Sequence, residues 1–478
     1  MVQRQLVAGV DSSTQSCKVV VCDAETGAVV REGRAAHPDG TEVSARSWWS
    51  AYREATAGGL LDGVGALAVA GQQHGMITLD EQGELVRDAL LWNDVRSAAD
   101  AADLVEELGG AQAWVDAMDV VPVASFTVSK LRWLARHEPD HLERTARVVL
   151  PHDWLTGRIL QDGNGFQEWT TDRGDASGTG YWSAVTGDYV PDMIRRAAGR
   201  AIEVPRVLGP AEAAGRTVDG LVVAPGTGDN MGAALGLCLR PGDVVVSLGT
   251  SGTVFAEHDT AVGDRSGEIA GFASALGGHL PLMCTLNAAR VLTAGAAVLG
   301  CDLSRFDQLA RSAEPGAGGL SLLPYLDGER TPNLPDATGT IGGLTRANAT
   351  PENLARAHVE GMLCNLAAGV DSLRRQGIRV DRVLLIGGAA ASRAVQDAAP
   401  MIFGVPVAVP APGEYVARGA ARQAAWVLSG AETPPEWPVT MGEIEPVPEG
   451  DDGARLRARY ADLFGTVHGP EPSRADYN

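Results

Sequence analysis

The sequence predicts an α/β protein made of two copies of one fold. Short apolar runs alternate with long helical patterns rich in Ala, Leu and Arg, which is typical of α/β domains. The chain has 478 residues, more than one hydrophobic core normally serves. A strand, a hydroxyl-rich turn and a second strand occur over residues 6–23 and again over 243–256. Duplication would produce this repetition, although two unrelated hairpins would as well.

Seven short segments have the composition of strands. Each is apolar and is bounded by residues that favour turns. They are Leu6–Val10, Lys18–Cys22, Ala66–Ala70, Leu221–Val223, Asp243–Leu248, Thr253–Ala256 and Arg382–Ile386.

Apolar residues at three- and four-residue steps predict helices between these strands. The best defined is Asn353–Arg375, because Thr350 suits an N-cap and Pro351 the first helical position. After Gly430 the chain becomes rich in Glu and Pro, and we expect a short helix over Ala454–Phe464 and a frayed end after Val467. The remaining helices are expected at Ser97–Leu108, Val128–His137, Met231–Leu239 and Asn287–Leu299.

The charge balance excludes some classes of partner. Arg and Lys number 39 against 60 Asp and Glu, so the formal net charge is -21. This argues against nucleic acids and anionic membrane surfaces. Only Lys18 and Lys130 are lysines, and neither lies in the Gly-Lys-Ser/Thr of a Walker A loop. Nucleotide phosphates would therefore meet backbone amides, hydroxyls and a metal ion.

The cysteines and the N-terminus favour a cytoplasmic protein. The six cysteines are scattered without metal-binding spacing, as expected in a reducing compartment. Asp11 follows the first apolar run too closely for a signal peptide. We find no apolar run of the roughly 18–20 residues that a membrane span needs.

Two turns have the composition of phosphate-binding loops. Asp11 ends the first strand and is followed by Ser13 and Thr14, so its carboxylate could hold Mg²⁺ while turn amides hold phosphate oxygens. Gly249, Thr250 and Ser251 form a second, uncharged turn. Each turn alone is equally typical of an exposed hairpin.

Asp229 is the candidate general base. It lies in Gly228-Asp-Asn230, where a strand gives way to a helix, and we expect helix amides to favour its ionised form. An ionised carboxylate there can take a proton from a substrate hydroxyl. The alternative role is a plain N-cap.

Further polar groups suit a sugar and a nucleotide base. Gln73 and His74 are neutral hydrogen-bonding residues, and Trp92 and Asp94 add an aromatic face and a carboxylate. Ordinary turns contain such residues too. Leu322–Pro332 is expected to be a lid, a domain-joining loop or a structured surface loop. Gly387 and Gly388 would let a flat base approach the backbone, or serve only for packing.

Taken in order, these segments resemble the FGGY family of carbohydrate kinases, and most closely its members that act on D-xylulose. The resemblance extends from about Leu6 to Trp426. The segments are Asp11–Ser16, Gly71–Gly75, Leu91–Asp94, Phe126–Trp133, Thr171–Gly178, Gly228–Asn230, Ser247–Gly252, Gly328–Pro332, Leu385–Gly388 and Glu414–Ala420.

The resemblance implies a duplicated actin-like, RNase H-like ATPase fold with a cleft between its domains. A sugar-binding domain is expected over residues 1–240 and an ATP-binding domain over 241–440, with residues 441–478 as a terminal segment. The implied reaction transfers phosphate from ATP to D-xylulose, giving D-xylulose 5-phosphate, with Mg²⁺ as cofactor. Asp229 would accept the proton, and Asp11 would serve the metal and the phosphates.

The resemblance also implies roles for the other candidates. The sugar would contact Gln73, His74, Asn230 and Asp229, with Trp92 and Asp94 near them. ATP would bind Ser13, Thr14, Gly249, Thr250, Ser251, Gly387 and Gly388. Three residues depart from the family pattern: Gln73 stands where many members have Met, and Ser13 and Ala389 stand where Gly is usual.

Other functions remain open at this stage. A related kinase could act on ribulose, another ketose or a polyol, because such specificity depends on a few hydrogen bonds. A non-catalytic actin-like nucleotide switch would not need Asp229 beside Gln73 and His74. A sugar-responsive transcription regulator would need an added basic domain, for which we find no room. The sequence leaves a homodimer open.

Overall fold

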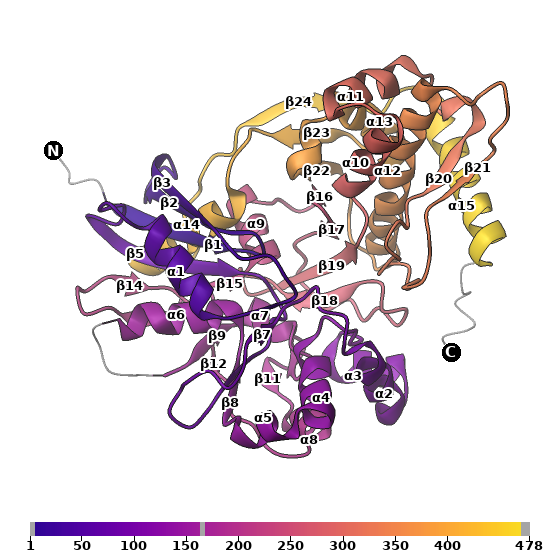
Figure 1. The fold of residues 1–478 in the computed structure, drawn as a ribbon. Helices are drawn as coiled ribbons and strands as arrows, with labels where there is room; N and C mark the ends of the chain where they lie inside the picture. Colours follow the sequence, from indigo (N-terminus) through magenta and orange to yellow (C-terminus); the bar gives the residue numbers. More distant parts are fainter. Residues whose placement is uncertain (1–4, 163–167, 470–478) are drawn as a thin grey trace.

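The computed structural model describes residues 5–162 and 168–469 (Figure 1). Two seven-stranded mixed sheets form its two halves, one in each half of the chain. The N-terminal sheet contains, in spatial order, β13 (Gly215–Arg216), β14 (Val222–Val223), β5 (Val64–Gly71), β1 (Leu6–Ser12), β2 (Ser16–Asp23) and β3 (Val29–Ala36), with β15 (Thr227–Gly228) also on β5. The C-terminal sheet contains β18 (Ala270–Ala273), β19 (His279–Thr285), β17 (Gly252–Phe255), β16 (Asp243–Leu248), β22 (Arg382–Ile386), β23 (Val407–Pro410) and β24 (Met441–Glu445).

The central strands of the two sheets have the same connections. β1 pairs antiparallel with β2 and parallel with β5, and β5 pairs parallel with β14. In the other half, β16 pairs antiparallel with β17 and parallel with β22, and β22 pairs parallel with β23. The predicted duplication of an α/β fold is therefore confirmed, and the repeated strand–turn–strand marks equivalent hairpins.

The predicted strands and helices agree with the structure except at some ends. Strands β16 and β22 have the predicted bounds. Helix α12 (Pro351–Arg375) begins as predicted, and the Thr350 hydroxyl accepts a hydrogen bond from the Asn353 amide at 3.2 Å. The prediction of a short helix at Ala454–Phe464 was wrong in length, because α15 covers Asp452–His468. The frayed end expected after Val467 lies mostly outside the described residues.

Helices cover both faces of the N-terminal sheet. α1 (Arg46–Ala55) and α6 (Pro151–Gln161) pack on one face. The other face is covered by α14 (Tyr415–Ser429), which lies within the predicted ATP-binding segment 241–440 and was not anticipated from the sequence. Its contact surface consists of small side chains, Ala417, Ala420, Ala421, Ala424 and Ala425. A helix from one half of the chain thus completes the core of the other.

The crossing of α14 with α9 (Asp229–Leu237) joins the two halves. A Cβ atom on Gly419 would lie 1.8 Å from the Gly232 carbonyl oxygen, and one on Gly236 would lie 2.0 Å from the Tyr415 oxygen. The helix backbones therefore approach as closely as glycine allows. Arg422 also donates a hydrogen bond to the Leu235 carbonyl oxygen at 2.8 Å. This oxygen lies near the C-terminal end of α9, where the helix dipole favours a cation.

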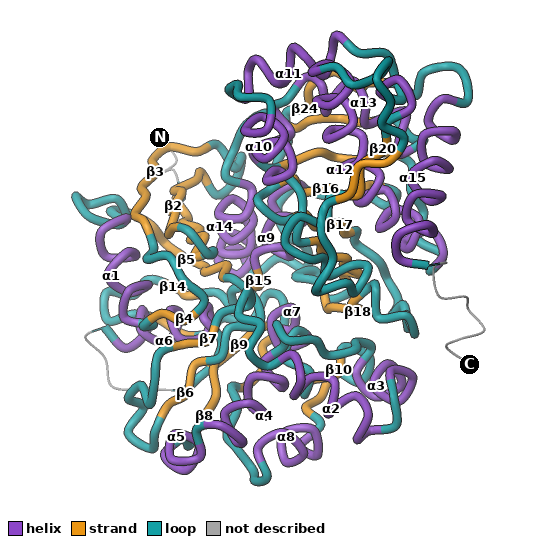
Figure 2. The backbone as a smooth tube through the Cα atoms, turned by 45° about the vertical axis from the view of Figure 1, so that its right-hand side comes forward, coloured by secondary structure: helices purple, strands orange, loops and turns teal. Residues whose placement is uncertain are grey.

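A long insertion after β5 lies beside both sheets and supplies much of the N-terminal half (Figures 1 and 2). Its buried residues share one core with α9 and with strands of the C-terminal sheet, through Phe126, Phe255 and Leu384 among others. The elements of this half outside the sheet are β4 (Glu42–Val43), β6 (Ile77–Leu79), β7 (Ala89–Leu90), α2 (Ala98–Leu108), α3 (Ala111–Met118), α4 (Thr127–His137), α5 (Pro139–Arg144), β8 (Arg147–Val149), β9 (Thr170–Asp172), α7 (Arg173–Ser177), β10 (Trp182–Ser183), β11 (Asp188–Tyr189), α8 (Pro191–Ala198) and β12 (Arg206–Leu208).

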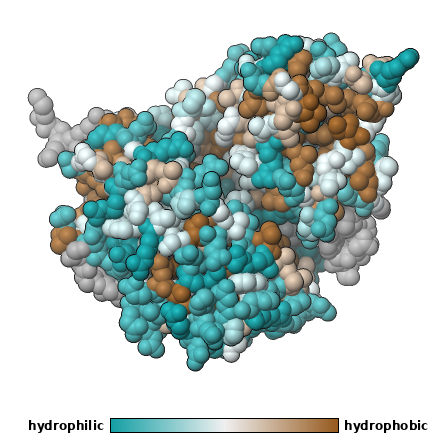
Figure 3. All heavy atoms as spheres, viewed as in Figure 1, coloured by the Kyte–Doolittle hydropathy of each residue, from teal (hydrophilic) through white to brown (hydrophobic). Residues whose placement is uncertain are grey.

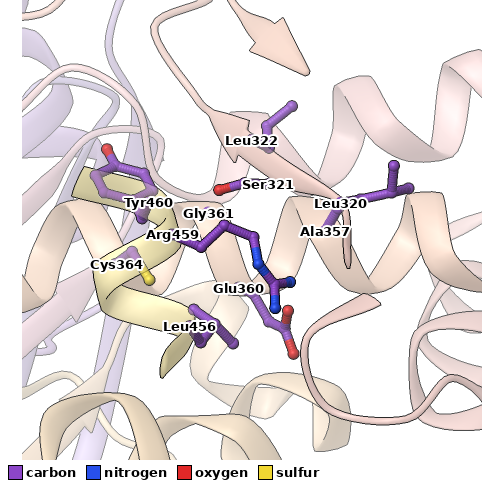
Figure 4. Close-up of a pocket in the computed structure, with 10 residues that line it drawn as sticks. All are labelled: Leu320, Ser321, Leu322, Ala357, Glu360, Gly361, Cys364, Leu456, Arg459 and Tyr460. Carbon is purple, nitrogen blue, oxygen red and sulfur yellow. The ribbon is translucent and has the colours of Figure 1, made fainter. Parts of the chain in front are cut away.

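The outer face of the C-terminal sheet is covered by α12 and its neighbours. These are α10 (Ala289–Val298), α11 (Leu303–Ser312), α13 (Arg393–Phe403) and α15, with a hairpin of β20 (Ser321–Leu323) and β21 (Thr340–Gly342). A small cavity between α12, β20 and α15 is lined by Glu360, Cys364 and Tyr460 (Figure 4). Figure 3 shows apolar side chains gathered over this half. No helix of the described ranges is long and apolar enough to cross a membrane.

Replacing Gly419 by alanine should destabilise the protein, because its methyl group would overlap the Gly232 carbonyl oxygen. Overpacking of this kind costs about 1–3 kcal/mol. Thermal unfolding should show a melting temperature several degrees lower. Gly465→Ala is the matched control, since nothing lies within 4 Å of a Cβ at that helical position. It should leave stability equal or slightly higher. Equal melting temperatures for the two variants would show that the crossing is not tight.

Candidate active site

The candidate residues lie where strand ends of the two halves face each other. Asp11 is at the end of β1, and Gln73 follows the end of the neighbouring parallel strand β5. Asp229 is the first residue of α9, directly after β15. In the other half, the turn after β16 leads to Thr253, which is hydrogen-bonded to Asn230, and the corner after β22 contacts Leu248 at the end of β16. Figure 2 shows β15 and α9 between the halves, as expected for ligand sites at the carboxyl ends of parallel strands.

Asp11 is almost fully buried and is held by its own turn. Its Oδ1 accepts a hydrogen bond from the Ser13 amide at 3.1 Å, and the Ser13 hydroxyl also donates to it. Burial raises the pKa of the Asp11 carboxyl, although Lys18 and Ser13 oppose this effect. A buried carboxylate with lone pairs to spare is a suitable ligand for a hard cation.

Lys18 belongs to this site although no sequence motif indicated it. Its Nζ lies 3.5 Å from Asp11 Oδ2 and 2.6 Å from Glu414 Oε2. The β1–β2 pairing sets Asp11 opposite Lys18. Pairing the residues of the two predicted strands outwards from their turn would have set Lys18 opposite Asp11. The search for a Walker A motif instead set Lys18 aside as a phosphate-binding residue. The strand register therefore places a lysine next to the turn that follows Asp11.

Asp229 has the protonation behaviour of a base that works near neutral pH. Its Oδ1 accepts hydrogen bonds from the Asn230 amide at 2.8 Å and the Asn230 side chain at 2.9 Å. Burial, together with the charge of Asp11, raises the pKa of Asp229 to about 7. The expectation that helix amides would favour the ionised form was wrong in its net effect, because burial and the second carboxylate outweigh the amides. Gly228, not Asp229, is the N-cap.

Gln73 and His74 are both buried. The side chain of Gln73 lies against Gly228, where a Cβ would be 2.7 Å from Gln73 Cγ. His74 Nδ1 lies 2.6 Å from the Gly178 carbonyl oxygen, so this nitrogen carries the proton. Burial, with Arg330 and Lys130 nearby, lowers the pKa of His74 to about 3. The ring is therefore neutral, and its Nε2 can accept a hydrogen bond from a hydroxyl.

Trp92 and Asp94 have different surroundings. The Trp92 Nε1 donates to the Thr14 hydroxyl at 2.8 Å, so this indole is joined to the turn that follows Asp11. The Asp94 carboxylate accepts from Arg96 Nε at 2.8 Å. Burial would raise the pKa of Asp94, but the contacts with Arg96 outweigh it and the pKa is lowered. Asp94 is thus an ionised residue already paired with a guanidinium.

The turn after β16 is fastened to the start of α10. The Gly249 oxygen accepts from the Ala289 amide at 2.9 Å, and the Thr250 oxygen accepts from the Ala288 amide at 3.3 Å. Thr253 donates to Asn230 Oδ1 at 3.2 Å. The turn with Gly249, Thr250 and Ser251 is therefore held in place. The hydrogen bond from Thr253 connects the strand that follows this turn to Asn230, the neighbour of Asp229.

The corner after β22 consists of Gly387, which is closely packed against Leu248, and Gly388, which is exposed. Gly387 has φ +89°, and a Cβ there would lie 2.6 Å from the Leu248 carbonyl carbon. Gly388 is exposed, and a Cβ there would meet nothing within 4 Å. Only glycine fits at Gly387. The flat exposed backbone beside it is compatible with the close approach of a nucleotide base.

A buried network behind the site was missed by the sequence reasoning. His152 Nδ1 lies 2.6 Å from Asp175 Oδ2 and 3.2 Å from Asp153 Oδ1, and Nε2 lies 3.2 Å from the Pro225 oxygen. Burial lowers the pKa of His152, but these carboxylates outweigh it and raise the pKa to about 10. The resulting imidazolium supports the segment that leads to Asp229. A single histidine gives no sequence signal for such a role.

Two duplicated α/β halves that enclose carboxylates on one side and glycine turns on the other define a sugar-kinase-type ATPase of the actin-like class. The family models agree with this class: the N-terminal domain of the FGGY family of carbohydrate kinases matches residues 6–236, and its C-terminal domain matches residues 244–428. The chain belongs to the FGGY family of carbohydrate kinases and is an ATP-dependent sugar kinase.

Several proteins that are similar to this chain over most of its length are named xylulose kinase. A xylulose kinase of Streptomyces coelicolor is 44% identical over 470 residues, which cover 95% of each chain. The Escherichia coli xylulose kinase is 32% identical over 408 residues, covering 80% of this chain and 82% of the relative. The crystal structure of xylulose kinase from Bifidobacterium adolescentis has a TM-score of 0.88 and 46% identity, covering 97% of this chain and all of that one.

Replacing Asp229 by asparagine should stabilise the protein above pH 7. A carboxyl whose pKa is raised to about 7 by folding costs stability once it is ionised in the folded state. The cost grows as the pH rises from about 4 towards 7 and is constant above that. The gain in melting temperature should therefore be full at pH 8 and vanish near pH 4. A gain independent of pH would contradict the electrostatic cause.

Proposed function

We propose that the protein transfers the terminal phosphoryl group of ATP to D-xylulose and releases ADP and D-xylulose 5-phosphate. The observation that carries the proposal is the position of Asp229 between two contacts. Gln73 packs against Gly228, the residue before it, and Asn230, the residue after it, accepts a hydrogen bond from Thr253, which follows the turn of Gly249. The near full-length similarity to proteins named xylulose kinase supports the choice of sugar. A nucleotide switch would have no use for this arrangement.

In the proposed reaction, the sugar is held by neutral hydrogen-bonding groups. His74 Nε2 would accept a hydrogen bond from a sugar hydroxyl, and the Gln73 amide can both donate and accept hydrogen bonds. Asn230 and Trp92 lie on the side towards the phosphates, where Asn230 contacts Thr253 and Trp92 contacts Thr14. The hydroxyl to be phosphorylated would lie between Asp229 and the turn of Gly249.

The proton and the phosphoryl group move in opposite directions. The hydroxyl oxygen bonds to the terminal phosphorus as the bond from phosphorus to the bridging oxygen of ADP breaks. The hydroxyl proton passes to the Asp229 carboxylate, whose pKa of about 7 suits both acceptance and later release. Because bond breaking leads in this type of transfer, the proton can move late.

ATP is assigned to the turns and the corner described above. Backbone amides and hydroxyls of Ser13, Thr14, Gly249, Thr250 and Ser251 would bind phosphate oxygens, with Gly387 and Gly388 beside the adenine. Asp11 would hold Mg²⁺. The donor set fits a cation, since Asp11 and Asp229 are carboxylates close enough for one to raise the pKa of the other. Bound Mg²⁺ would neutralise charge on the phosphates.

We propose a cytoplasmic location and no nucleic-acid partner. The six cysteines are all unpaired in the structure, in keeping with a reducing compartment. The net charge of -21 opposes binding to a polyphosphate backbone. A homodimer stays a prediction that sedimentation analysis would decide.

Asp229→Ala should reduce kcat at least about 10²–10⁴-fold, the usual contribution of a general base. The wild-type kcat/KM should fall as the pH drops below about 7, because Asp229 must be ionised to accept the proton. ADP release measured with D-xylulose, ribulose, polyols and hexoses would test the base and the sugar together. Undiminished turnover of the variant would remove Asp229 from its role. Preference for another sugar would overturn the assignment of D-xylulose.

Removal of divalent cations with EDTA should abolish turnover, and added Mg²⁺ should restore it. Asp11→Asn should then need a higher Mg²⁺ concentration for half-maximal rate, because one charged ligand is lost. Titration of activity against Mg²⁺ at fixed ATP measures the shift. An unchanged Mg²⁺ requirement in Asp11→Asn would show that the ion is held without this carboxylate.

A further inference from the structure

The loop over residues 327–332 carries an arginine towards the site from the C-terminal half. Glu329, the residue before it, is 1% exposed and acts as an anchor. Its carboxylate accepts hydrogen bonds from the Leu286 amide at 2.5 Å and from Asn287 Nδ2 at 3.0 Å. It also accepts from the Arg330 amide at 2.8 Å. The backbone at Arg330 is therefore held firmly, and the loop is not a free lid.

The same short segment fixes the phosphate turn. Residues 286–287 anchor the loop, while the next two amides, of Ala288 and Ala289, donate to the oxygens of Thr250 and Gly249. The loop of Arg330 and the proposed phosphate turn are thus attached to one point of the scaffold. A group carried by the loop is therefore fixed relative to this turn.

The side chain of Arg330 reaches the pair of strands β17 and β19. It hydrogen-bonds the Cys284 thiol, and Cys284 is paired with Thr253 across β17 and β19. Thr253 in turn donates to Asn230, the neighbour of Asp229. Asp229 is close enough to Cys284 to influence its pKa. The guanidinium therefore contacts Cys284, whose strand partner Thr253 links the turn of Gly249 to the neighbour of the proposed base.

The surroundings of this guanidinium include the neutral imidazole of His74 and the amine of Lys130. After burial, which is the larger effect, its charge contributes to lowering the pKa of His74 and the pKa of Lys130, the latter to about 7. Within residues 5–162 and 168–469, no carboxylate lies at ion-pair distance from it. Arg290, by contrast, pairs with Asp327 of the same loop at 2.7 Å. A half-buried guanidinium without an ion-pair partner attracts an anion.

We propose that Arg330 is a catalytic residue that binds the phosphoryl group while it passes from ATP to the sugar. This rests on the proposed function. A guanidinium can donate two parallel hydrogen bonds to phosphoryl oxygens, and it forms no covalent bond in the reaction. Its charge offsets the negative charge that the phosphoryl oxygens carry in the transition state. The transferred group would supply the counterion that the free protein lacks.

Steady-state kinetics of Arg330→Gln and Arg330→Lys test the proposal. Loss of a cation that stabilises transferring phosphate costs about 10³-fold or more in kcat. We expect such a loss in Arg330→Gln, with KM for ATP and for the sugar changed less than about threefold, since uniform binding is not what is lost. Arg330→Lys should recover part of kcat, because the charge returns without the planar fork.

Chemical rescue separates catalysis from a structural role. Millimolar guanidinium ion should raise the kcat of Arg330→Ala several-fold while leaving the wild type unchanged, because the free ion can occupy the emptied place. Thermal unfolding of each variant checks that it is folded, and Arg330→Lys keeps the test available if the smaller side chains destabilise the loop. Arg311→Gln is the matched control: Arg311 pairs with Asp397 at 2.9 Å on the surface of the same half, and its kcat should equal that of wild type.

Three results would overturn the proposal: a kcat of Arg330→Gln within about threefold of wild type, a change in sugar KM alone, or no rescue by guanidinium in a folded variant. Failure of the proposed function is a different result. If the wild type phosphorylates another sugar and not D-xylulose, the same comparison is made with that sugar. Arg330 is then judged on phosphoryl transfer, independently of which sugar accepts it.

Discussion

The repulsion between two buried carboxylates, Asp11 and Asp229, is the constraint around which the site is arranged. Each would be more stable alone or in water, and burial together with their proximity raises the pKa of Asp229. The scaffold imposes the arrangement, because Asp229 begins a helix whose backbone is clamped against α14 by glycine. Lys18 and Asn230 compensate only in part. A bound metal ion or a proton would reduce the repulsion that remains between the two carboxylates. A contact that is unfavourable in the free protein would therefore favour the binding of a cation and the uptake of a proton.

Much of the fold could be predicted from the sequence because its signals are local. Strands β16 and β22 and the cap of α12 follow from apolar runs, turn residues and a Thr-Pro start. The position of α14 could not be predicted in this way. Its alanine-rich face only indicates a close partner, and the partner lies about 350 to 410 residues earlier in the chain, in β1, β2 and β5. Likewise β3 has exposed residues at alternate positions, so little apolar periodicity marks it.

The candidate site shows the same division. The candidates near strand ends, such as Asp11, Gln73 and Asp229, were selected because a strand followed by polar groups is a local pattern. Lys18 and Arg330 were not selected, since their importance comes from register and from a loop folded over another segment. The protonation of Asp229 was also beyond a local argument: the amides of its helix are visible in the sequence, whereas burial and the opposing carboxylate are not. Motifs therefore identify the atoms of a site more readily than its electrostatics.

The packing of α14 has a consequence for the synthesis of the chain. The N-terminal sheet presents a face of small apolar side chains that is covered only when residues 415–429 have been made. Until the ribosome has released that helix, Val7, Val20 and Ala68 lack their native cover. The two halves therefore do not mature one after the other, and the first remains open until nearly the whole chain has emerged. The halves of this duplicated fold are repeats of one topology, but they are not independent units of folding.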